Sequence, residues 1–386
     1  MKKQSNAPQI RFQNFEDEWV KQSLGKTVEI IMGQSPDSKN YTDNPNDYIL
    51  VQGNADMQNG RVVPRVWTTQ ITKLAEKGDL ILSVRAPVGD IGKTDYNVVL
   101  GRGVAAIKGN EFLFQLLTKM KQSHYWSKFS TGTTFESINS NDIKSAEIYL
   151  PSIEEQSAIG FLFRTLDDLL TSYKNNLANY QSLKATMLSK MFPKAGQTVP
   201  EIRLDGFEDE WEKGTIGEFG SFYYGKSAPK WSVTDEATTP CVRYGELYTK
   251  FYTKIDKIYS YTSIPKENLK LSSGNEVLVP RVGENPLDFA NCSWLSLKDV
   301  AIGEMISVYN TPNNPLFIAY YFNAKMRKEF AKRVEGGSVA NLYYTYLENI
   351  SISVPSIPEQ QAIGAYFSNL DKIINSYQEK ISQLET

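Results

Sequence analysis

The chain has 386 residues, which predicts two or three domains, and 41% hydrophobic with 22% charged residues indicates packed cores rather than general disorder. Lysine and arginine total 42 against 44 acidic residues, which excludes a protein that holds nucleic acid through overall positive charge. With only two cysteines and one histidine, we expect no disulfide framework and no metal site.

The N-terminal residues and the hydropathy of the chain show no targeting signal. No apolar segment follows the lysines at positions 2 and 3, so the sequence predicts no secretory signal. No run of about 18 apolar residues is available to cross a bilayer. We therefore expect a cytoplasmic protein without a membrane partner.

The chain consists of two copies of one plan. Residues 8–19 (PQIRFQNFEDEW) and 200–211 (PEIRLDGFEDEW) are identical at eight of twelve positions, at an offset of 192. Residues 150–170 and 354–374 share eleven of twenty-one positions, at an offset of 204. Identity is almost lost between these matched ends. Neutral drift after duplication is one explanation; the other, which we favour, is a common frame that carries two different recognition surfaces.

The middle of each copy, residues 20–150 or 212–354, carries short apolar runs bounded by glycine, proline or asparagine. Such runs are typical of β-strands. Shorter helical patterns occur at 112–128 and 315–333. The sequence therefore predicts an α+β fold with two similar domains.

Loops of both middle segments are rich in side chains that can contact DNA. Arginine pairs with guanine, glutamine or asparagine pairs with adenine, and backbone amides bind phosphate. Taken singly, each of these residues is better explained as ordinary surface. The candidate DNA-binding residues are Gln34, Ser35, Gln52, Asn54, Arg85, Lys93, Arg102 and Thr133 in the first copy, and Lys226, Ser227, Arg243, Tyr244, Arg281 and Ser338 in the second.

Each copy ends in a predicted long helix. Ser152 with Glu155, and Ser356 with Glu359, fit a capping box, in which the glutamate side chain reaches back to the backbone of the serine. Apolar residues then follow at spacings of three and four, interrupted in the first helix at Lys184. A single helix covering a core would show the same stripe, but two equivalent stripes in one chain can bury each other. We therefore predict an antiparallel coiled coil.

The predicted helix–helix seam consists of Ile159, Phe163, Leu166, Leu170, Tyr173 and Leu177 in the first helix, and Ile363, Phe367, Leu370, Ile374, Tyr377 and Ile381 in the second. The predicted boundaries are a first domain at 1–151, a first helix at 152–192, a linker at 193–206, a second domain at 207–355 and a second helix at 356–386. The two halves would be related by a pseudo-twofold axis.

The duplicated helix starts LPSIEEQ (150–156) and VPSIPEQ (354–360), together with FEDEW at 15–19 and 207–211, resemble the specificity subunit of type I restriction-modification systems. The resemblance covers essentially the whole chain. Three further segments look like motifs of that family's target recognition domains: GQSP (33–36), QGN (52–54) and GDLILSVRAP (78–87).

This resemblance implies a non-catalytic subunit of a bacterial or archaeal complex. Each target recognition domain would read one half of a bipartite double-stranded DNA target, and the helices would set the spacing. Two modification subunits, which methylate adenine, would dock on the helices, and restriction subunits would join through the complex. The chain itself would need no cofactor; S-adenosylmethionine, ATP and magnesium would belong to the partner subunits.

Other functions fit the sequence less well. The nearest match to the [DN]PP[YF] motif of adenine methyltransferases, at residues 314–317, lacks the second proline. No Glu-x-Lys nuclease motif occurs, and the related segments at 37–39 and 142–144 have no counterpart in the other copy. The remaining alternative is a scaffold in which two modules on a coiled coil bind proteins and not DNA.

Overall fold

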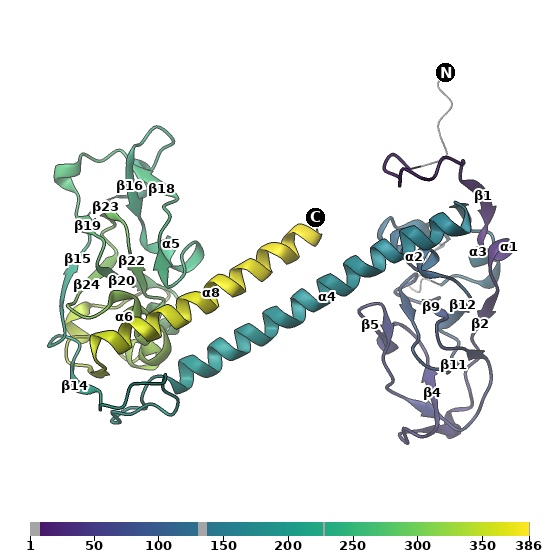
Figure 1. The fold of residues 1–386 in the computed structure, drawn as a ribbon, viewed down its shortest axis with the longest axis horizontal. Helices are drawn as coiled ribbons and strands as arrows, with labels where there is room; N and C mark the ends of the chain where they lie inside the picture. Colours follow the sequence, from purple (N-terminus) through teal and green to yellow (C-terminus); the bar gives the residue numbers. More distant parts are fainter. Residues whose placement is uncertain (1–7, 130–136, 227, 386) are drawn as a thin grey trace. The chain divides into compact units, whose positions relative to one another are not determined.

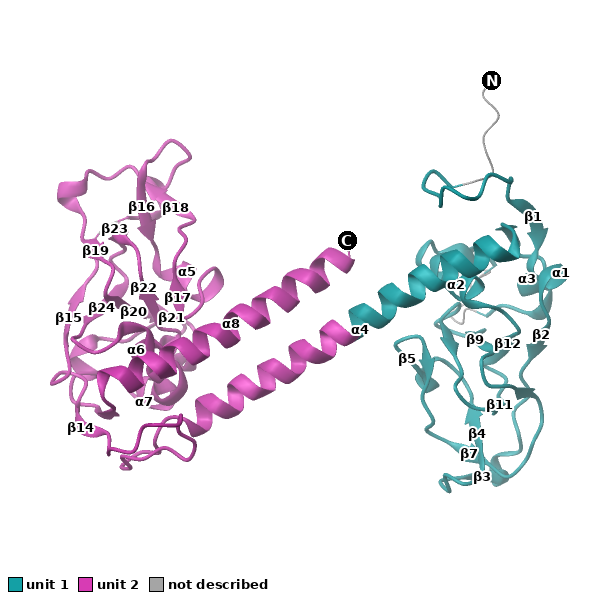
Figure 2. Cartoon of the chain, in the orientation of Figure 1, with its two compact units in different colours: residues 1–171 teal, residues 172–386 magenta. Residues whose placement is uncertain are grey.

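The structure is a computed structural model that describes residues 8–129, 137–226 and 228–385. It divides into two compact units, Met1–Thr171 (unit 1) and Ser172–Thr386 (unit 2), as Figures 1 and 2 show. Each unit combines sheets with helices, which confirms the predicted α+β fold class. The division lies inside one long helix, α4 (Ile153–Lys190), which belongs to both units.

In the described part of unit 1, the strands form three sheets. In spatial order they are β1 (Val20–Ser23) and β13 (Glu147–Leu150); β2 (Ile30–Met32), β12 (Val104–Ile107), β9 (Leu80–Ser83), β10 (Ile91–Lys93), β6 (Arg61–Val62) and β5 (Met57–Gln58); and β3 (Tyr41–Thr42), β7 (Trp67–Thr68), β4 (Tyr48–Val51), β11 (Val98–Leu100) and β8 (Leu74–Ala75). The helices before α4 are α1 (Leu24–Thr27), α2 (Glu111–Gln122) and α3 (Ser140–Lys144).

The core of unit 1 lies on both faces of the sheet that contains β9 and β12. Both strands are apolar except for Ser83 at the end of β9, and every residue in them is buried. Leu82 and Ala105 face one cluster, which also holds Phe112 of α2, whereas Ile81 and Ala106 face a second cluster. Successive side chains of a strand point to opposite faces of the sheet, so each of these strands contributes residues to both clusters.

In the described part of unit 2, the strands form four sheets. In spatial order they are β14 (Glu212–Thr215) and β27 (Ser351–Val354); β15 (Ser221–Tyr224), β24 (Ile306–Asn310), β20 (Glu276–Pro280), β22 (Ser293–Leu295) and β17 (Lys254–Ile255); β18 (Ser260–Thr262), β16 (Thr239–Val242), β23 (Lys298–Ile302) and β19 (Leu271–Ser273); and β21 (Val282–Gly283), β26 (Ala340–Asn341) and β25 (Glu335–Gly336). The helices are α5 (Tyr244–Thr249), α6 (Pro315–Tyr321), α7 (Arg327–Ala331), α8 (Ile357–Glu385) and the last part of α4.

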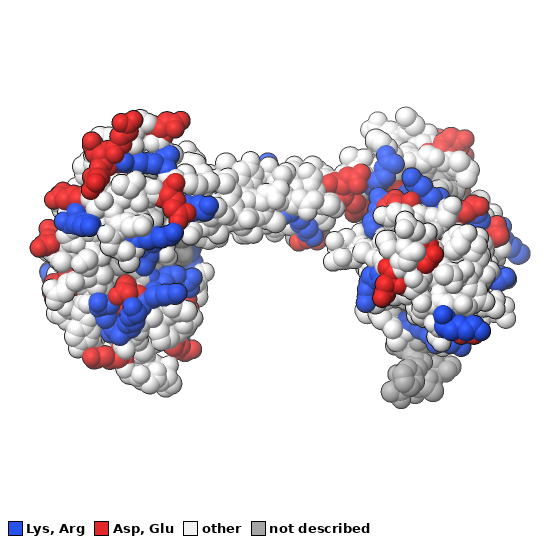
Figure 3. All heavy atoms as spheres, turned by 90° about the horizontal axis from the view of Figure 1, so that it is seen from below, with Lys and Arg blue, Asp and Glu red and all other residues white. Residues whose placement is uncertain are grey.

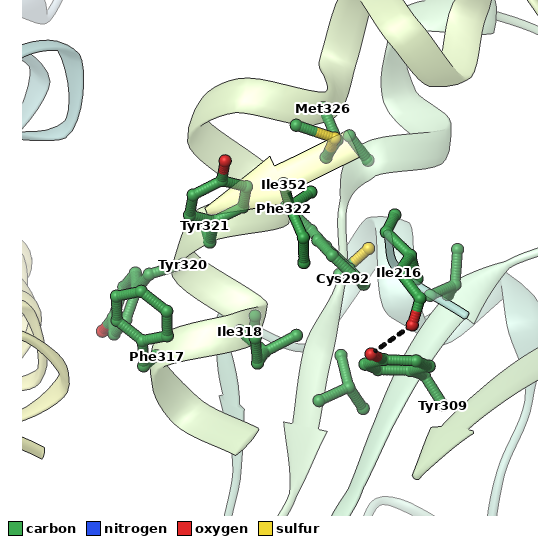
Figure 4. Packing of buried hydrophobic residues seen from close by; sticks show 14 of the residues in the cluster. Ile216, Cys292, Tyr309, Phe317, Ile318, Tyr320, Tyr321, Phe322, Met326 and Ile352 are labelled. Carbon is green, nitrogen blue, oxygen red and sulfur yellow. Dashed lines mark hydrogen bonds between the residues drawn. The ribbon is translucent and has the colours of Figure 1, made fainter. Parts of the chain in front are cut away.

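The largest core cluster of unit 2 joins α6 to the sheet that contains β20 and β24. Phe317 and Ile318 of α6 are fully buried in it, together with Tyr309 of β24 (Figure 4). The hydroxyl of Tyr309 donates a hydrogen bond to the carbonyl of Ile216, at 2.8 Å. The buried phenol therefore satisfies its polar atom while it contributes its ring to the packing.

The matched ends of each repeat pair with each other. In unit 1, β1 runs antiparallel to β13, with Val20 opposite Leu150. In unit 2, β14 runs antiparallel to β27 in the corresponding register, with Glu212 opposite Val354. The start and end of each copy therefore form one structural frame, which explains why both ends keep their sequence while the middle diverges.

A bidentate ion pair joins these ends again in both units. Arg203 donates to both carboxylate oxygens of Glu359, at 2.8 and 2.7 Å, and to the carbonyl of Asp209. Arg11 makes the same pair with Glu155, with both distances 2.7 Å. The hydrogen bonds to these carboxylates raise the pKa of both arginines. The predicted capping boxes are therefore wrong in one respect: each glutamate carboxylate binds an arginine and not the backbone of the serine.

The glutamine that follows each of these glutamates fastens the helix start to its own unit. The Gln156 amide donates to the carbonyl of Pro151 and accepts from Asn110. In unit 2, the Gln360 amide donates to the carbonyl of Pro355 and to Asn313. The EQ dipeptide shared by the two copies thus has a structural role in attaching each helix.

The predicted antiparallel helix pair is present between α8 and the part of α4 that lies in unit 2. The ring of Tyr377 lies 5.7 Å from those of both Tyr173 and Tyr180. Lys174 pairs with Glu385, at the C-terminal end of α8. Later residues of α4 therefore contact earlier residues of α8, so the two helices run antiparallel. Lys184, which interrupts the apolar stripe, pairs with Asp371 of α8.

The seam prediction is wrong for the early residues of α4. Phe163 and Leu166 are 45% and 36% exposed in this structure. Ile159 packs against the core of unit 1 instead. In α8, the predicted seam residues Ile363, Phe367 and Leu370 belong to the main core of unit 2, where Tyr180, Leu183 and Met187 of α4 also pack.

Candidate nucleic-acid interface

In unit 1, candidate residues meet at the turn between β11 and β12, which consists of Gly101, Arg102 and Gly103. The amide of Gln34 donates to the carbonyl of Leu100 at 2.9 Å, and Ser35 Oγ accepts from the amide of Arg102 at 3.0 Å. The approach is close, because a Cβ atom on Gly33 would lie only 2.0 Å from the carbonyl oxygen of Gly101. Only glycine permits this contact.

Two further loops reach the same turn. The amide of Gly101 donates to the carbonyl of Val51 at 2.7 Å, which places Gln52 beside the turn. The amide of Val84 donates to the carbonyl of Gly103 at 2.9 Å, which places Arg85 there. The structure therefore brings together five residues from four separate loops: Gln34, Ser35, Gln52, Arg85 and Arg102.

Unit 2 repeats this arrangement at the turn between β23 and β24, which consists of Gly303, Glu304 and Met305. The amide of Lys226 donates to the carbonyl of Ile302, and the amide of Gly303 donates to the carbonyl of Val242, which precedes Arg243. The amide of Arg281 donates to the carbonyl of Met305 at 3.2 Å. Three candidate residues, Lys226, Arg243 and Arg281, therefore lie around the equivalent turn.

The equivalent turns carry opposite charges at their tips. Arg102 occupies the tip in unit 1 and Glu304 the tip in unit 2, and both are exposed. Within the described residues, neither side chain has an ion-pair partner. The same backbone geometry thus presents hydrogen-bond donors in one unit and acceptors in the other.

The remaining candidate residues differ in their surroundings. Asn54 lies two residues after Gln52 in the same loop. The carboxylate of Asp56 stabilises this loop by accepting hydrogen bonds from the backbone amides of residues 52 and 53. Tyr244 follows Arg243 at the start of α5, and Ser338 is exposed in the connection between β25 and β26. Lys93 lies on β10, where its ammonium group pairs with Glu111 at 2.7 Å. Thr133 and Ser227 lie outside the described residues.

Two aromatic rings lie against Arg281, and no prediction from the sequence included them. The guanidinium carbon lies 4.5 Å from the ring centroid of Tyr224 and 5.5 Å from that of Tyr343, both within cation–π distance. Tyr224 lies 57 residues before Arg281 and Tyr343 lies 62 residues after it. No local pattern could have associated these three residues.

A second feature that the predicted residues did not include is a segment, residues 250–261, that contains three lysines and four aromatic residues. The ammonium groups of Lys250 and Lys257 lie 5.6 and 5.3 Å from the ring centroid of Tyr259. Tyr252 and Tyr261 of the same segment are exposed. Lysine can bind phosphate and an exposed aromatic ring can stack on a base. The local concentration of lysine and aromatic residues is the signal that could have identified this segment.

On the face drawn in Figure 3, the charged groups do not form one continuous basic surface. Lysine and arginine are there interspersed with aspartate and glutamate over each unit (Figure 3). Any DNA contact must therefore depend on local groups such as those at the two turns, and not on a general positive field.

No metal centre or reactive thiol is evident in the described residues. They contain no group of three or more histidine, cysteine, aspartate or glutamate side chains that could hold a metal ion. Burial raises the pKa of Cys241 to about 11 and also raises that of Cys292, so both thiols stay protonated near neutral pH. No helix in the described part of the chain is long and apolar enough to span a membrane.

Comparisons with known proteins agree with this duplicated architecture. A family model described as "Type I restriction modification DNA specificity domain" matches residues 16–180 and again 208–386. The putative type I restriction enzyme MjaX specificity subunit of Methanocaldococcus jannaschii is 32% identical over 181 residues, which is 45% of this chain and 42% of that protein. The MjaIX specificity subunit of the same organism is 23% identical over 318 residues, covering 79% of this chain and 73% of that one.

A solved structure shows the same fold. The type I restriction-modification S subunit from M. genitalium matches with a TM-score of 0.59 and 16% identity, covering 97% of this chain and 94% of that chain. At this identity the match establishes the fold alone.

Proposed function

Since the chain belongs to the family defined by the type I restriction-modification DNA specificity domain, we propose that it is the DNA sequence-recognition subunit of such a complex. One observation carries this proposal: each unit gathers loop side chains around an equivalent turn, and the side chains differ between the units. Two different sites in one chain suit a target with two different halves, each read by one unit.

The helices would serve this function by spacing the two sites and by docking partners. We infer that two modification subunits, which methylate adenine with S-adenosylmethionine, bind the α4–α8 pair, and that restriction subunits join through the complex. The chain itself would be non-catalytic and would use no cofactor, and the complex would act in the cytoplasm. The exposed apolar residues of α4, among them Phe161 and Phe163, support a docking role for this helix.

Incubation of the chain with its modification subunit and a randomised DNA duplex pool tests the proposal. With a formal net charge of −2, the chain alone supplies little general affinity for phosphate, so the assay needs the assembled complex. Mapping methylated adenines after the reaction should recover one split motif with a fixed gap. Recovery of no split motif, with the complex intact by size-exclusion chromatography, would instead favour a protein scaffold that does not bind DNA.

A further inference from the structure

The backbone of Arg281 is held on both sides by hydrogen bonds to two neighbouring segments. Its amide donates to the carbonyl of Met305, in the turn between β23 and β24, at 3.2 Å. Its carbonyl accepts from the amide of Leu342, which follows β26, at 2.8 Å. The position of the Cα atom is therefore fixed by the turn that gathers the candidate residues of unit 2.

The side chain of Arg281 is held by aromatic rings. Tyr224 and Tyr343 lie against the guanidinium group, with ring centroids 4.5 and 5.5 Å from its carbon. The ring of Tyr224 is itself packed 4.6 Å from Tyr344, which stacks on Phe222 at 5.4 Å with an interplanar angle of 5°. The rings that hold the guanidinium group are thus supported by further rings.

The polar atoms of the guanidinium group have no partner in the described residues. No carboxylate lies within ion-pair distance, and Nε is buried without a hydrogen bond. Ring faces stabilise the positive charge but do not accept hydrogen bonds as a carbonyl or ring nitrogen does. A planar cation that is fixed in place with free N–H groups is prepared for a ligand with two adjacent acceptors in one plane.

The equivalent site of unit 1 lacks these rings. At the repeat offsets of 192 and 204, the positions of Tyr224 and Tyr343 correspond to Met32 and Asn139. The backbone hydrogen bonds that Arg281 makes with Met305 and Leu342 are made in unit 1 by Val84, with Gly103 and Ile138, so a buried valine stands where unit 2 has the arginine. The aromatic support is therefore specific to unit 2, as expected for a feature that distinguishes two half-sites and not for part of the common frame.

From this geometry, and resting on the proposed function, we propose that Arg281 is the specificity-determining residue of unit 2. It reads a guanine through hydrogen bonds to O6 and N7 in the major groove, the bidentate pair that arginine makes with this base. Tyr224 and Tyr343 are positioning residues, which fix the plane of the guanidinium group before DNA binds.

The test uses the complete complex with its modification subunits and compares three variants by adenine-methylation mapping on a randomised duplex pool. Arg281→Lys keeps the positive charge but cannot form the bidentate pair, so preference for guanine at one position of one half-site should fall by about tenfold to a hundredfold. Tyr343→Leu should weaken the same preference by about fivefold, because one ring face is lost. Tyr343→Phe keeps the ring face and should retain the preference.

The half-site read by unit 1 is an internal control and should be unchanged in all three variants. If Arg281→Lys weakens binding to every sequence equally, Arg281 contacts phosphate and the inference is wrong. If no position changes its base preference while the wild type still yields a split motif, the inference fails and the proposed function stands. If the wild type yields no split motif, the proposed function itself fails. Melting temperatures identify any variant that does not fold. If Arg281→Lys is unfolded, the guanine preference of Tyr343→Leu is compared with that of Tyr343→Phe, and equal preferences would contradict the inference.

Discussion

At the scale of single residues, the carboxylate of Glu359 is the buried acceptor that attaches α8 to the start of its own repeat. Its side chain is 1% exposed and that of Arg203 is 14% exposed. Two charge-assisted hydrogen bonds in a site with little water contribute more than an exposed pair does. The same pair in unit 1, between Arg11 and Glu155, indicates that the frame of each repeat depends on it.

We expect Glu359→Ala to lower the free energy of unfolding of unit 2 by about 2 kcal/mol, because Arg203 loses its acceptors in a largely buried site. Thermal unfolding of the full chain, followed by circular dichroism, measures this change. Glu201→Ala is the matched control, since Glu201 pairs with Lys194 in an exposed position and its loss should change the transition little. Equal effects of the two substitutions would contradict a structural role for the buried pair.

At the scale of elements, α4 has two parts with different surroundings. Near its start, Gly160 packs closely against Glu111 and Phe112 of unit 1. From Tyr173 onward, it packs against α8. All residues from 161 to 169 are exposed. Within this stretch Asp167 accepts a hydrogen bond from Gln115 of α2 at 2.7 Å. A segment inserted after residue 168 would therefore disturb neither the contacts with unit 1 nor those with α8.

Duplication of residues 162–168 should lengthen α4 by about 10 Å and keep its helical phase, since seven residues make nearly two turns. We expect both half-sites to be retained and the gap between them to grow by about three base pairs, at 3.4 Å per base pair. Methylation mapping on a randomised pool measures the gap. Duplicating only two residues turns the downstream helix by about 200°, and this control should abolish recognition. An unchanged gap in the seven-residue variant would show that α4 does not set the spacing.

At the scale of the whole molecule, the two units repeat one frame but present different side chains at equivalent turns. Arg102 in unit 1 stands where Glu304 stands in unit 2. An exposed arginine can donate to guanine, whereas a glutamate can accept from the amino group of cytosine. The two halves of the target should therefore be read independently of each other.

We expect Arg102→Ala to relax base preference in one half-site by about 1–3 kcal/mol of discrimination and to leave the other half-site unchanged. Enrichment of half-sites from a randomised pool by the assembled complex measures both effects together. Arg61→Ala is the control, because Arg61 is also exposed in unit 1 but is paired with Asp95. Loss of preference in both half-sites would show that the units do not act separately.

Local signals in the sequence were sufficient to predict the frame. The repeat offsets identified two similar domains, and the short apolar runs in the middle of each copy indicated strands, among them the buried strands β9 and β11. The starts of α4 and α8 followed from the duplicated SIEEQ and SIPEQ motifs. These features depend on neighbours within a few residues in the chain, so the sequence carries them directly.

Only the tertiary structure decided which distant residues meet. Glu359 binds an arginine 156 positions away instead of its own helix start. Of the predicted seam residues, Ile159 packs against the core of unit 1, whereas Ile363 and Phe367 belong to the main core of unit 2. The two rings at Arg281, those of Tyr224 and Tyr343, come from segments far apart in the chain that only the pairing of strands brings together. The amino-acid sequence by itself determined two repeats of an α+β frame with long helices. The composition of each site depended on the pairing of strands far apart in the chain, which no local pattern encodes.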